Sequence, residues 1–232
     1  MVKAAKHFVI VHDQYAYAKE IVTLLNHGVV KTTIVTQELT ALGRFNNIVK
    51  YRQEQASNMP NTKMYAIQFP VLVPPRGPLP AAGSTVYVHS KIVIVDGLAA
   101  IVGSANMCQR SFFTDHEITV AVVDPVVVRS FMIVLVAQWL AVTEASLSHL
   151  TNNEIHELLR SRPDTNTTHL ATYTPDGDTP FTATEVFWEL IGDPDLSVLP
   201  RWYVDSKHSA SSTIIVHVIV LYVVPLLLIV IS

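Results

Sequence analysis

The chain has 232 residues, 50% of them hydrophobic and 15% charged, which is enough for one sizeable domain with a core and an appendage. Its formal net charge of -3, from 16 basic and 19 acidic side chains, gives no electrostatic footprint for nucleic acid and argues against that partner. A single cysteine excludes an internal disulfide framework.

The N-terminal part of the chain alternates between strand and helix patterns. Short apolar runs predict strands, and apolar side chains at helical spacing predict helices between them. The predicted segments are a strand at 7–11, a helix at 16–25, a strand at 31–36, a helix at 45–55, extended chain at 63–73 and a proline-rich loop at 74–80. Such alternation is typical of an α/β domain.

The most informative stretch lies at 86–106 and reads as a strand, a turn and a second strand. Because alternate side chains of a strand share a face, His89 and Lys91 converge on one spot. Asp96 and Gly97 predict the turn, and Gly103 closes the second strand. After it come the hydroxyl of Ser104 and, two residues later, the amide of Asn106; both can hold phosphate oxygens.

These residue types suit the cleavage of a phosphodiester. Histidine is the usual side chain for nucleophilic or proton-transfer work near neutral pH, because its unperturbed pKa lies near 6.5. The charge of Lys91 offsets the growing negative charge on the phosphorus oxygens. A carboxylate is still needed to orient the imidazole, and Glu117 is the candidate.

The pattern H-x-K-x4-D-x6-G-S-x-N resembles the HKD signature of the phospholipase D superfamily. It matches at each fixed position: His89, Lys91, Asp96, Gly103, Ser104 and Asn106. The wider sequence is similar to the C-terminal motif region of phosphatidylcholine-hydrolysing phospholipases D of the bacterial type. The resemblance covers residues 7–145 and is strongest at 86–124; within it, Gln14 and Tyr15 are similar to a pair near the active site of such enzymes.

The resemblance implies a fold, a site and no cofactor. The expected fold is α/β, with a phospholipase D-like mixed sheet flanked by helices that forms a single HKD half. The implied catalytic residues are His89, Lys91, Asp96 and Glu117, and the implied phosphate-binding residues are Lys91, Ser104, Asn106 and Gln14. Among them, Asp96 has the role of orienting its loop rather than of doing chemistry. No metal is expected.

The family builds its site from two HKD motifs, and this chain has one. There are two ways to complete the site. Either two copies of the chain pair symmetrically, as in single-motif nucleases of the superfamily, or the chain is a second half that needs a missing first half. In the first case both copies of His89 share the roles of nucleophile and general acid; in the second, His89 is the general acid.

Three segments follow the motif. The apolar run at 126–142 follows Asp124 and Pro125, which suit a helix start, and Arg129 and Gln138 interrupt it; we expect a helix that covers the sheet rather than a membrane span. Residues 143–212 are predicted to be polar and loop-like. The nineteen apolar residues at 213–231 are long enough to cross a bilayer core of about 30 Å.

The predicted organisation is therefore a catalytic half-domain at 1–145, a loop-rich extension at 146–212 and a hydrophobic helix at 213–231 that spans or anchors to a membrane. A tail anchor, a glycolipid-anchor signal and a buried helix are the alternatives for the last segment. The anchor predicts a membrane location, without fixing the compartment.

Three functions fit the sequence. The first is a phospholipase D-type enzyme that releases phosphatidate and the head-group alcohol from phosphatidylcholine or a similar phospholipid through a phosphohistidine intermediate. The second is a single-motif, homodimeric, nuclease-like phosphodiesterase. The third is a catalytically incomplete membrane-anchored fragment. Head-group preference lies in loop shapes that the sequence does not reveal.

Overall fold

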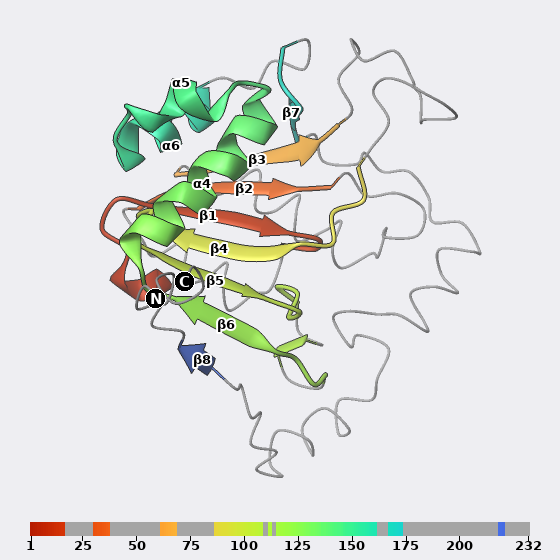
Figure 1. Cartoon of the computed structure of the whole chain (residues 1–232). Helices are drawn as coiled ribbons and strands as arrows, with labels where there is room; N and C mark the ends of the chain where they lie inside the picture. The colour runs from red at the N-terminus through yellow and green to blue at the C-terminus, as the bar shows by residue number, and fades with distance from the viewer. Residues whose placement is uncertain are drawn as a thin grey trace, which may run out of the picture.

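The protein is described by a computed structural model for residues 1–16, 30–37, 61–68, 86–108, 111–112, 115–161, 167–173 and 218–220. Its centre is a mixed sheet with the strand order β7-β3-β2-β1-β4-β5-β6-β8 (Figure 1). The strands are β1 (Phe8–Asp13), β2 (Lys31–Thr36), β3 (Thr62–Ile67), β4 (Lys91–Val95), β5 (Ala99–Gly103), β6 (Thr119–Val122), β7 (Leu170–Thr172) and β8 (Val218–Val220). A short 3-10 helix, η1 (Val2–Ala4), precedes β1.

The direction of the strands decides which chain ends meet. Strands β1, β2 and β3 run parallel, whereas β4 lies antiparallel to β1 and β5 antiparallel to β4. Strand β6 is antiparallel to β5. The carboxyl ends of β1, β2, β3 and β5 therefore lie at the same edge of the sheet as the amino ends of β4 and β6.

The β4–β5 hairpin forms at the turn that the sequence predicts. Asp96 and Gly97 have φ values of 54° and 66°, which aspartate tolerates and glycine adopts freely. The N–H of Leu98 closes the turn by donating to the carbonyl of Val95 at 2.9 Å. The side-chain amide of Asn152 then donates to the carbonyls of Asp96 at 3.1 Å and Gly97 at 3.3 Å.

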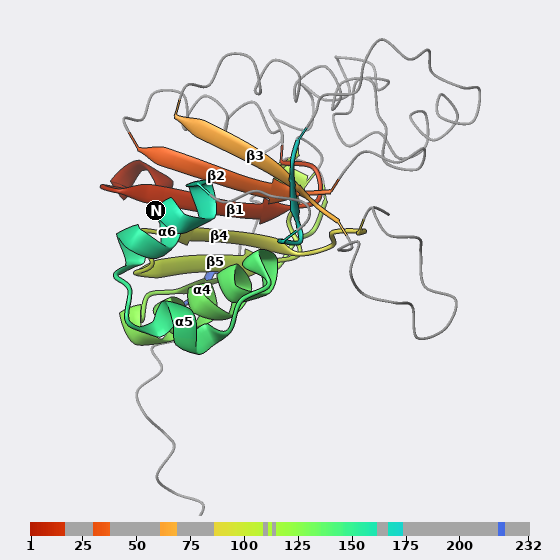
Figure 2. The same ribbon diagram turned by 90° about the horizontal axis from the view of Figure 1, so that it is seen from above.

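Helix α4 (Pro125–Leu140) begins where Asp124 and Pro125 predict it. The Asp124 carboxylate accepts the N–H groups of Val126 at 2.9 Å and Val127 at 3.2 Å, which caps the helix. The helix ends at Ala141, whose φ of 52° is left-handed. Figure 2 shows α4 together with α5 (Glu144–Ser148) and α6 (Asn152–Ser161) on one face of the sheet, so the expectation of a covering helix is confirmed.

The core has two parts, one on each face of the sheet. On the helix face, Phe8 of β1 and Ile94 of β4 belong to one cluster with Met132 of α4 and Ile155 of α6. On the other face, Val9, Val93 and Met107 belong to a second cluster. Because alternate residues of β1 and β4 face opposite ways, both of these strands are buried on both faces.

The prediction that residues 143–212 are loop-like is wrong for α5, α6 and β7. Thr151 and Glu154 cap α6 reciprocally: the Thr151 N–H donates to the Glu154 carboxylate at 2.7 Å, and the Glu154 N–H donates to the Thr151 hydroxyl at 3.3 Å. Leu147, Ile155, Leu159 and Leu170 of these elements pack into the helix-side core. This stretch therefore shares its core with the strands of 1–145.

At the C-terminus the structure differs from the predicted helix. Of the segment 213–231 only residues 218–220 are described, and they form β8, which pairs in parallel with β6. Valine and isoleucine are β-branched and favour strands, and β6 offers the unpaired backbone groups of a sheet edge. Among the helices of the described ranges, none is long and apolar enough to cross a membrane.

Several predicted segments cannot be compared with the structure. Nearly all of the helix at 16–25, all of the helix at 45–55 and the loop at 74–80 lie outside the described residues. The predicted extended chain at 63–73 overlaps β3, and the strand at 31–36 coincides with β2. The mixed α/β sheet flanked by helices is confirmed.

Candidate active site

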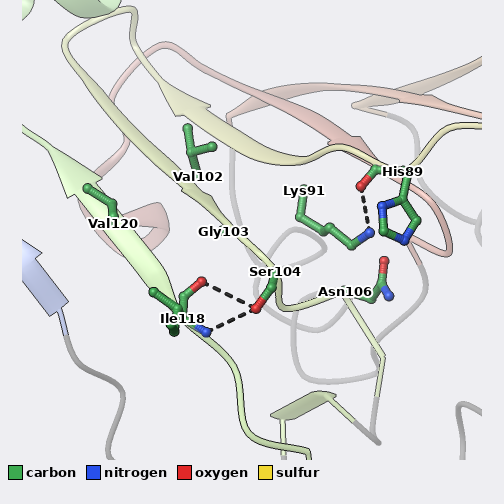
Figure 3. Close-up of a pocket in the computed structure, with 8 residues that line it drawn as sticks. All are labelled: His89, Lys91, Val102, Gly103, Ser104, Asn106, Ile118 and Val120. Atoms are coloured by element: carbon green, nitrogen blue, oxygen red, sulfur yellow. Dashed lines mark hydrogen bonds between the residues drawn. The ribbon is translucent and has the colours of Figure 1, made fainter.

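Most of the motif residues gather at the sheet edge where β1 and β5 end and β4 and β6 begin. An open pocket of about 450 Å³ lies there, and Figure 3 shows its lining side chains from three neighbouring strands and the loops that continue them. The lining residues are His89, Lys91, Val102, Gly103, Ser104, Asn106, Ile118 and Val120. Four of the predicted site residues therefore come together: His89, Lys91, Ser104 and Asn106.

Lys91 is held beneath His89. The lysine is only 7% exposed, and its Nζ donates to the main-chain carbonyl of His89 at 2.5 Å, whereas the imidazole itself is on an exposed residue (Figure 3). Burial lowers the pKa of Lys91, while the carboxylates of Asp13 and Glu117 and the thiol of Cys108 oppose that shift. The result is a fixed cation at the base of a solvent-accessible imidazole.

Tyr87 and Gln14 form a second support for the imidazole. The rings of Tyr87 and His89 stack with their centroids 5.8 Å apart and an interplanar angle of 20°. The Gln14 side-chain amide donates to the Tyr87 hydroxyl at 2.8 Å. Gln14 is buried and is absent from the pocket lining, so the structure places it behind the tyrosine rather than at the predicted phosphate-binding position.

Ser104 and Asn106 differ in whether their side chains are hydrogen-bonded. The Ser104 hydroxyl donates to the Glu117 carboxylate at 2.5 Å and accepts the N–H of Ile118 at 3.0 Å (the latter drawn in Figure 3). The Asn106 side-chain oxygen is buried and makes no hydrogen bond in the structure. The amide of Asn106 is therefore not fully paired in this structure, whereas Ser104 must release Glu117 before its hydroxyl can donate to a ligand.

Glu117 does not hold the imidazole in this structure. Its carboxylate accepts from Ser104, and no hydrogen bond joins it to His89, although both residues are described. The carboxylate does contribute to the charge around Lys91. The geometry thus links Glu117 to the phosphate-binding side of the pocket, and its predicted role as the orienting group is not seen.

Asp96 lies away from the pocket, at the opposite end of β4. Its carboxylate accepts the N–H groups of Lys6 at 2.8 Å, His7 at 2.9 Å and Phe8 at 2.8 Å. Burial would raise the pKa of Asp96, but these backbone hydrogen bonds outweigh burial and lower it. Asp96 therefore anchors the start of β1 to the β4–β5 turn. It does not lie with the other predicted catalytic residues.

Two polar groups that the sequence reading did not place in the site support it from neighbouring strand ends. Asp13, the last residue of β1, pairs in register with Lys91. Gln37, just after β2, accepts the N–H of Val88 at 2.9 Å. Both residues could have been found from the sequence as polar residues at the carboxyl ends of predicted parallel strands, because such ends meet at one edge of the sheet.

The pocket also has an apolar side that the motif does not predict. Val102 and Val120 sit opposite one another in the β5–β6 register, and Ile118 precedes β6. Ile118 is 65% exposed and Val102 is 37% exposed. Polar donors and an exposed aliphatic surface therefore face the same space.

Among the described residues, the lining contains a single histidine. Displacement at phosphorus needs both a nucleophile and a proton donor, so this lining supplies one of the two imidazoles that would fill these roles. Within the described ranges, no group of three His, Cys, Asp or Glu side chains is placed to hold a metal ion. The charge-stabilising groups around the imidazole are the ammonium of Lys91 and the side chains of Ser104 and Asn106.

Comparison with known proteins gives matches of three kinds. The family described as "Cardiolipin synthase, PLD-like domain" matches residues 3–139, more than half of the chain. Phospholipase D zeta 1 of Arabidopsis thaliana is 53% identical over 55 residues, which make up 23% of this chain and 5% of that relative. The match thus spans a small fraction of the relative's own length.

Two solved structures are similar over about half of the chain. NucT from Helicobacter pylori is 19% identical, with a TM-score of 0.38, and the match covers 50% of this chain and 68% of NucT. Nuc from Salmonella typhimurium, a phospholipase D family member, is 19% identical, with a TM-score of 0.40, and the match covers 56% of this chain and 76% of Nuc.

Proposed function

This chain belongs to the family "Cardiolipin synthase, PLD-like domain" of the phospholipase D superfamily, and from that premise we propose that it cleaves the phosphodiester bond of a membrane phospholipid. The proposed substrate is phosphatidylcholine or a similar lipid, and the products are phosphatidate and the head-group alcohol. The active form needs a second HKD motif, from a second copy or from a missing first half.

The composition of the pocket supports a lipid substrate. Lys91, Ser104 and Asn106 can bind the phosphate oxygens, and Val102 and Ile118 provide an aliphatic surface beside them. A phospholipid presents the same two chemistries next to one another, an anionic phosphodiester and an apolar glyceride. This juxtaposition is the single observation on which the choice of lipid rests.

The proposed reaction uses two imidazoles. One attacks phosphorus and forms a nitrogen–phosphorus bond, while the ester oxygen of the head group leaves and takes a proton from the other. Water, deprotonated by the second imidazole, then breaks the nitrogen–phosphorus bond and yields phosphatidate. Lys91 stabilises the negative charge that spreads over the non-bridging oxygens, with Asn106 as a neutral donor.

The apolar C-terminal segment supports a membrane location as part of the proposal. Residues 213–231 are nineteen consecutive apolar or weakly polar residues, a length that suits a bilayer anchor. In the structure residues 218–220 of this run pair with β6, so anchoring requires that the run leave the edge of the sheet and enter the bilayer. In that state it would hold the pocket close to its lipid. The compartment is not part of the proposal.

A nuclease-like homodimer is the second candidate, and the single imidazole of the pocket favours it. Two copies of His89 facing one another would supply both the nucleophile and the acid without any other chain. The net charge of -3 counts against a nucleic-acid substrate, because binding of that polymer rests largely on neutralised phosphates.

The test is choline release from phosphatidylcholine by the full chain in mixed micelles, with ethanol present. We expect choline and phosphatidylethanol, because an alcohol competes with water for a covalent phosphohistidine. The His89→Asn variant should lose both products, and Asp124→Asn, at a helix cap outside the pocket lining, should keep them. Equal activity of the wild type and His89→Asn would refute the assignment; cleavage of DNA but not of lipid would favour the second candidate.

A further inference from the structure

Asp13 is the most deeply buried carboxylate near the pocket, with 1% of its surface exposed. One of its oxygens accepts the N–H groups of Tyr15 at 2.9 Å and Ala16 at 2.7 Å, which folds the chain as it leaves β1. The other oxygen accepts the N–H of Met107 at 3.1 Å, from a residue 94 positions further along the chain. Burial raises the pKa of Asp13, and the three backbone hydrogen bonds and the charge of Lys91 oppose that shift by favouring the ionised carboxylate.

The bond to Met107 fixes the loop that carries the donors of the site. Met107 directly follows Asn106, and on the other side of Asn106 the Ser104 hydroxyl is bonded to Glu117 and Ile118. Asn106 lies between the two attachment points. The position of the Asn106 side chain, whose amide nitrogen can donate to an oxyanion, therefore depends on the Asp13–Met107 bond.

Asp13 also acts on Lys91 through charge. The two residues are register partners on β1 and β4, so their side chains share one face of the sheet. Burial lowers the pKa of Lys91, and Asp13 is the largest of the groups that oppose this, ahead of Glu117 and Cys108. These three groups are the titratable side chains that act on the ammonium, together with the carbonyl of His89 that accepts from it.

We propose that Asp13 is a positioning residue for oxyanion binding: it ties the Asn106 loop to the end of β1 and keeps Lys91 charged beneath His89. The inference rests on the proposed function only in so far as the pocket binds a phosphate-like oxyanion. It does not depend on which phosphodiester is cleaved.

The variant Asp13→Asn discriminates between the roles of this side chain. The amide oxygen can keep the bonds to Tyr15 and Ala16, whereas the amide nitrogen is a donor and cannot accept from Met107. The substitution therefore removes the tether and the negative charge while keeping the turn and the side-chain volume. Asp13→Glu keeps the charge and alters the reach, so it separates the tether from the charge.

The experiment is an NMR titration of the full chain in detergent with sulfate, which stays a dianion over the pH range used. Wild-type affinity should fall on the alkaline side as Lys91 loses its proton, and Lys91→Gln, which lacks that proton, should remove this limb. For Asp13→Asn we expect roughly tenfold weaker sulfate binding at neutral pH, since a charge-assisted bond is lost. We also expect the alkaline limb, the fall in sulfate affinity with rising pH, to move to lower pH. For Asp13→Glu we expect weaker binding with the limb unmoved.

Asp124→Asn is the matched control. It makes the same substitution at another carboxylate that accepts backbone N–H groups, those of Val126 and Val127, far from the pocket lining. Its sulfate affinity and pH limb should equal those of the wild type. Amide exchange at Met107 should accelerate in Asp13→Asn and stay unchanged in the control.

The outcomes separate the two proposals. Sulfate affinity, pH limb and Met107 exchange that are all unchanged in Asp13→Asn would overturn the role of Asp13, and so would a wild type that binds no sulfate. Sulfate binding with the predicted shifts, but no cleavage of phospholipid, would leave Asp13 in place and reject the lipid substrate. If Asp13→Asn fails to fold, Asp13→Glu decides: wild-type affinity in that variant would overturn the tether.

Discussion

Two aspartates bracket β4 and show how position decides the work of a carboxylate. Asp96 accepts three backbone N–H groups at the turn end of the strand, and Asp13 accepts three at the pocket end. The motif spacing predicted that Asp96 belongs to the signature, and the Asp-Gly pair predicted its turn. Nothing local marks Asp13, because its partners, Lys91 of β4 and Met107 of the loop after β5, are brought beside it only by the fold.

For Asp96→Asn we expect a loss of about 2 kcal/mol in the free energy of unfolding at neutral pH, because one hydrogen bond is lost and a donor is set against N–H groups. The folded pKa of Asp96 is lowered, so its stabilisation is present above the unfolded pKa of about 3.9 and is lost as pH falls through the folded value. Urea unfolding at pH 7 and pH 3 measures this. The gap between wild type and variant should narrow at pH 3; a gap that widens would contradict the structural role.

Gly103 is needed for a close approach rather than for its torsion angles. A Cβ at this position would lie 2.5 Å from the carbonyl oxygen of Ile118 and 2.7 Å from the Thr119 hydroxyl. Gly103→Ala must therefore push the start of β6 away, and with it one wall of the pocket. We expect lower stability by about 1–3 kcal/mol, as for other overpacked sites, and weaker sulfate binding.

Thermal and urea unfolding measure the first effect, and the sulfate titration measures the second. Ala99→Gly, a change in the opposite sense at the other end of β5, is a suitable comparison, since it leaves the Ile118 contact intact. Unchanged stability and sulfate affinity in Gly103→Ala would show that the β6 start yields at no cost.

At the scale of the elements, buried histidines join β1 to the helices. The ring of His12 packs against Trp139 of α4, with the centroids 5.1 Å apart. His156 of α6 stacks on Phe8 at 4.3 Å and lies 3.0 Å from the Thr33 hydroxyl. Burial lowers the pKa of His12 to about 4 and, with the nearby charge of Arg160, that of His156 to about 3. Both rings are therefore neutral in the folded protein at physiological pH.

This arrangement predicts acid sensitivity. The unfolded chain binds protons at both histidines below about pH 6.5, whereas the folded protein does not, so stability falls as pH drops from there towards the folded pKa values. For His12→Phe, which cannot titrate, the loss between pH 7 and pH 4.5 should be smaller than in the wild type by about 2 kcal/mol. Urea unfolding at the two pH values decides; equal losses would mean that His12 is protonated in place.

The elements were predictable where local signals agree with the tertiary context. Strand 31–36, the Asp-Gly hairpin and the start of α4 at Pro125 all follow from local patterns. Helix α6 also had a signal in the sequence, the capping pair Thr151 and Glu154 before Ile155. The prolines further along nevertheless led to a loop prediction for the whole region. The strand at 218–220 was not predictable, because an apolar β-branched run suits a helix in lipid as well as a strand at a sheet edge.

At the scale of the whole molecule, a chain with a single motif is expected to be active only when a second imidazole is supplied by another copy or another chain. If two copies of His89 share one site, a mixed dimer of wild type and His89→Asn has a nucleophile or an acid, but not both. Activity should then fall with the square of the wild-type fraction when the two are co-expressed in varied ratios. A linear fall would show that each copy acts alone and would point to a missing first half.

The pocket residues that a sequence pattern can reveal are those whose neighbours are close in the chain. His89, Lys91, Ser104 and Asn106 fall within one hairpin and its loop, and the structure brings them together. Gln14 was placed by resemblance, and Glu117 was chosen as the carboxylate that the imidazole needs. In the structure Gln14 donates to Tyr87, and Glu117 accepts from Ser104. The apolar wall of Val102 and Ile118 has no signature, because exposed aliphatic residues on a strand look like core until the fold is known.

The order of strands also sets when the site can first exist. Strand β1 is made early, but its pairing with β4 waits for Lys91–Val95, and the bond from Asp13 waits for Met107, 94 residues later. Closing so long a loop costs chain entropy before any contact repays it, which slows folding. A growing chain on the ribosome therefore carries no assembled pocket until β5, its loop and β6 have all emerged.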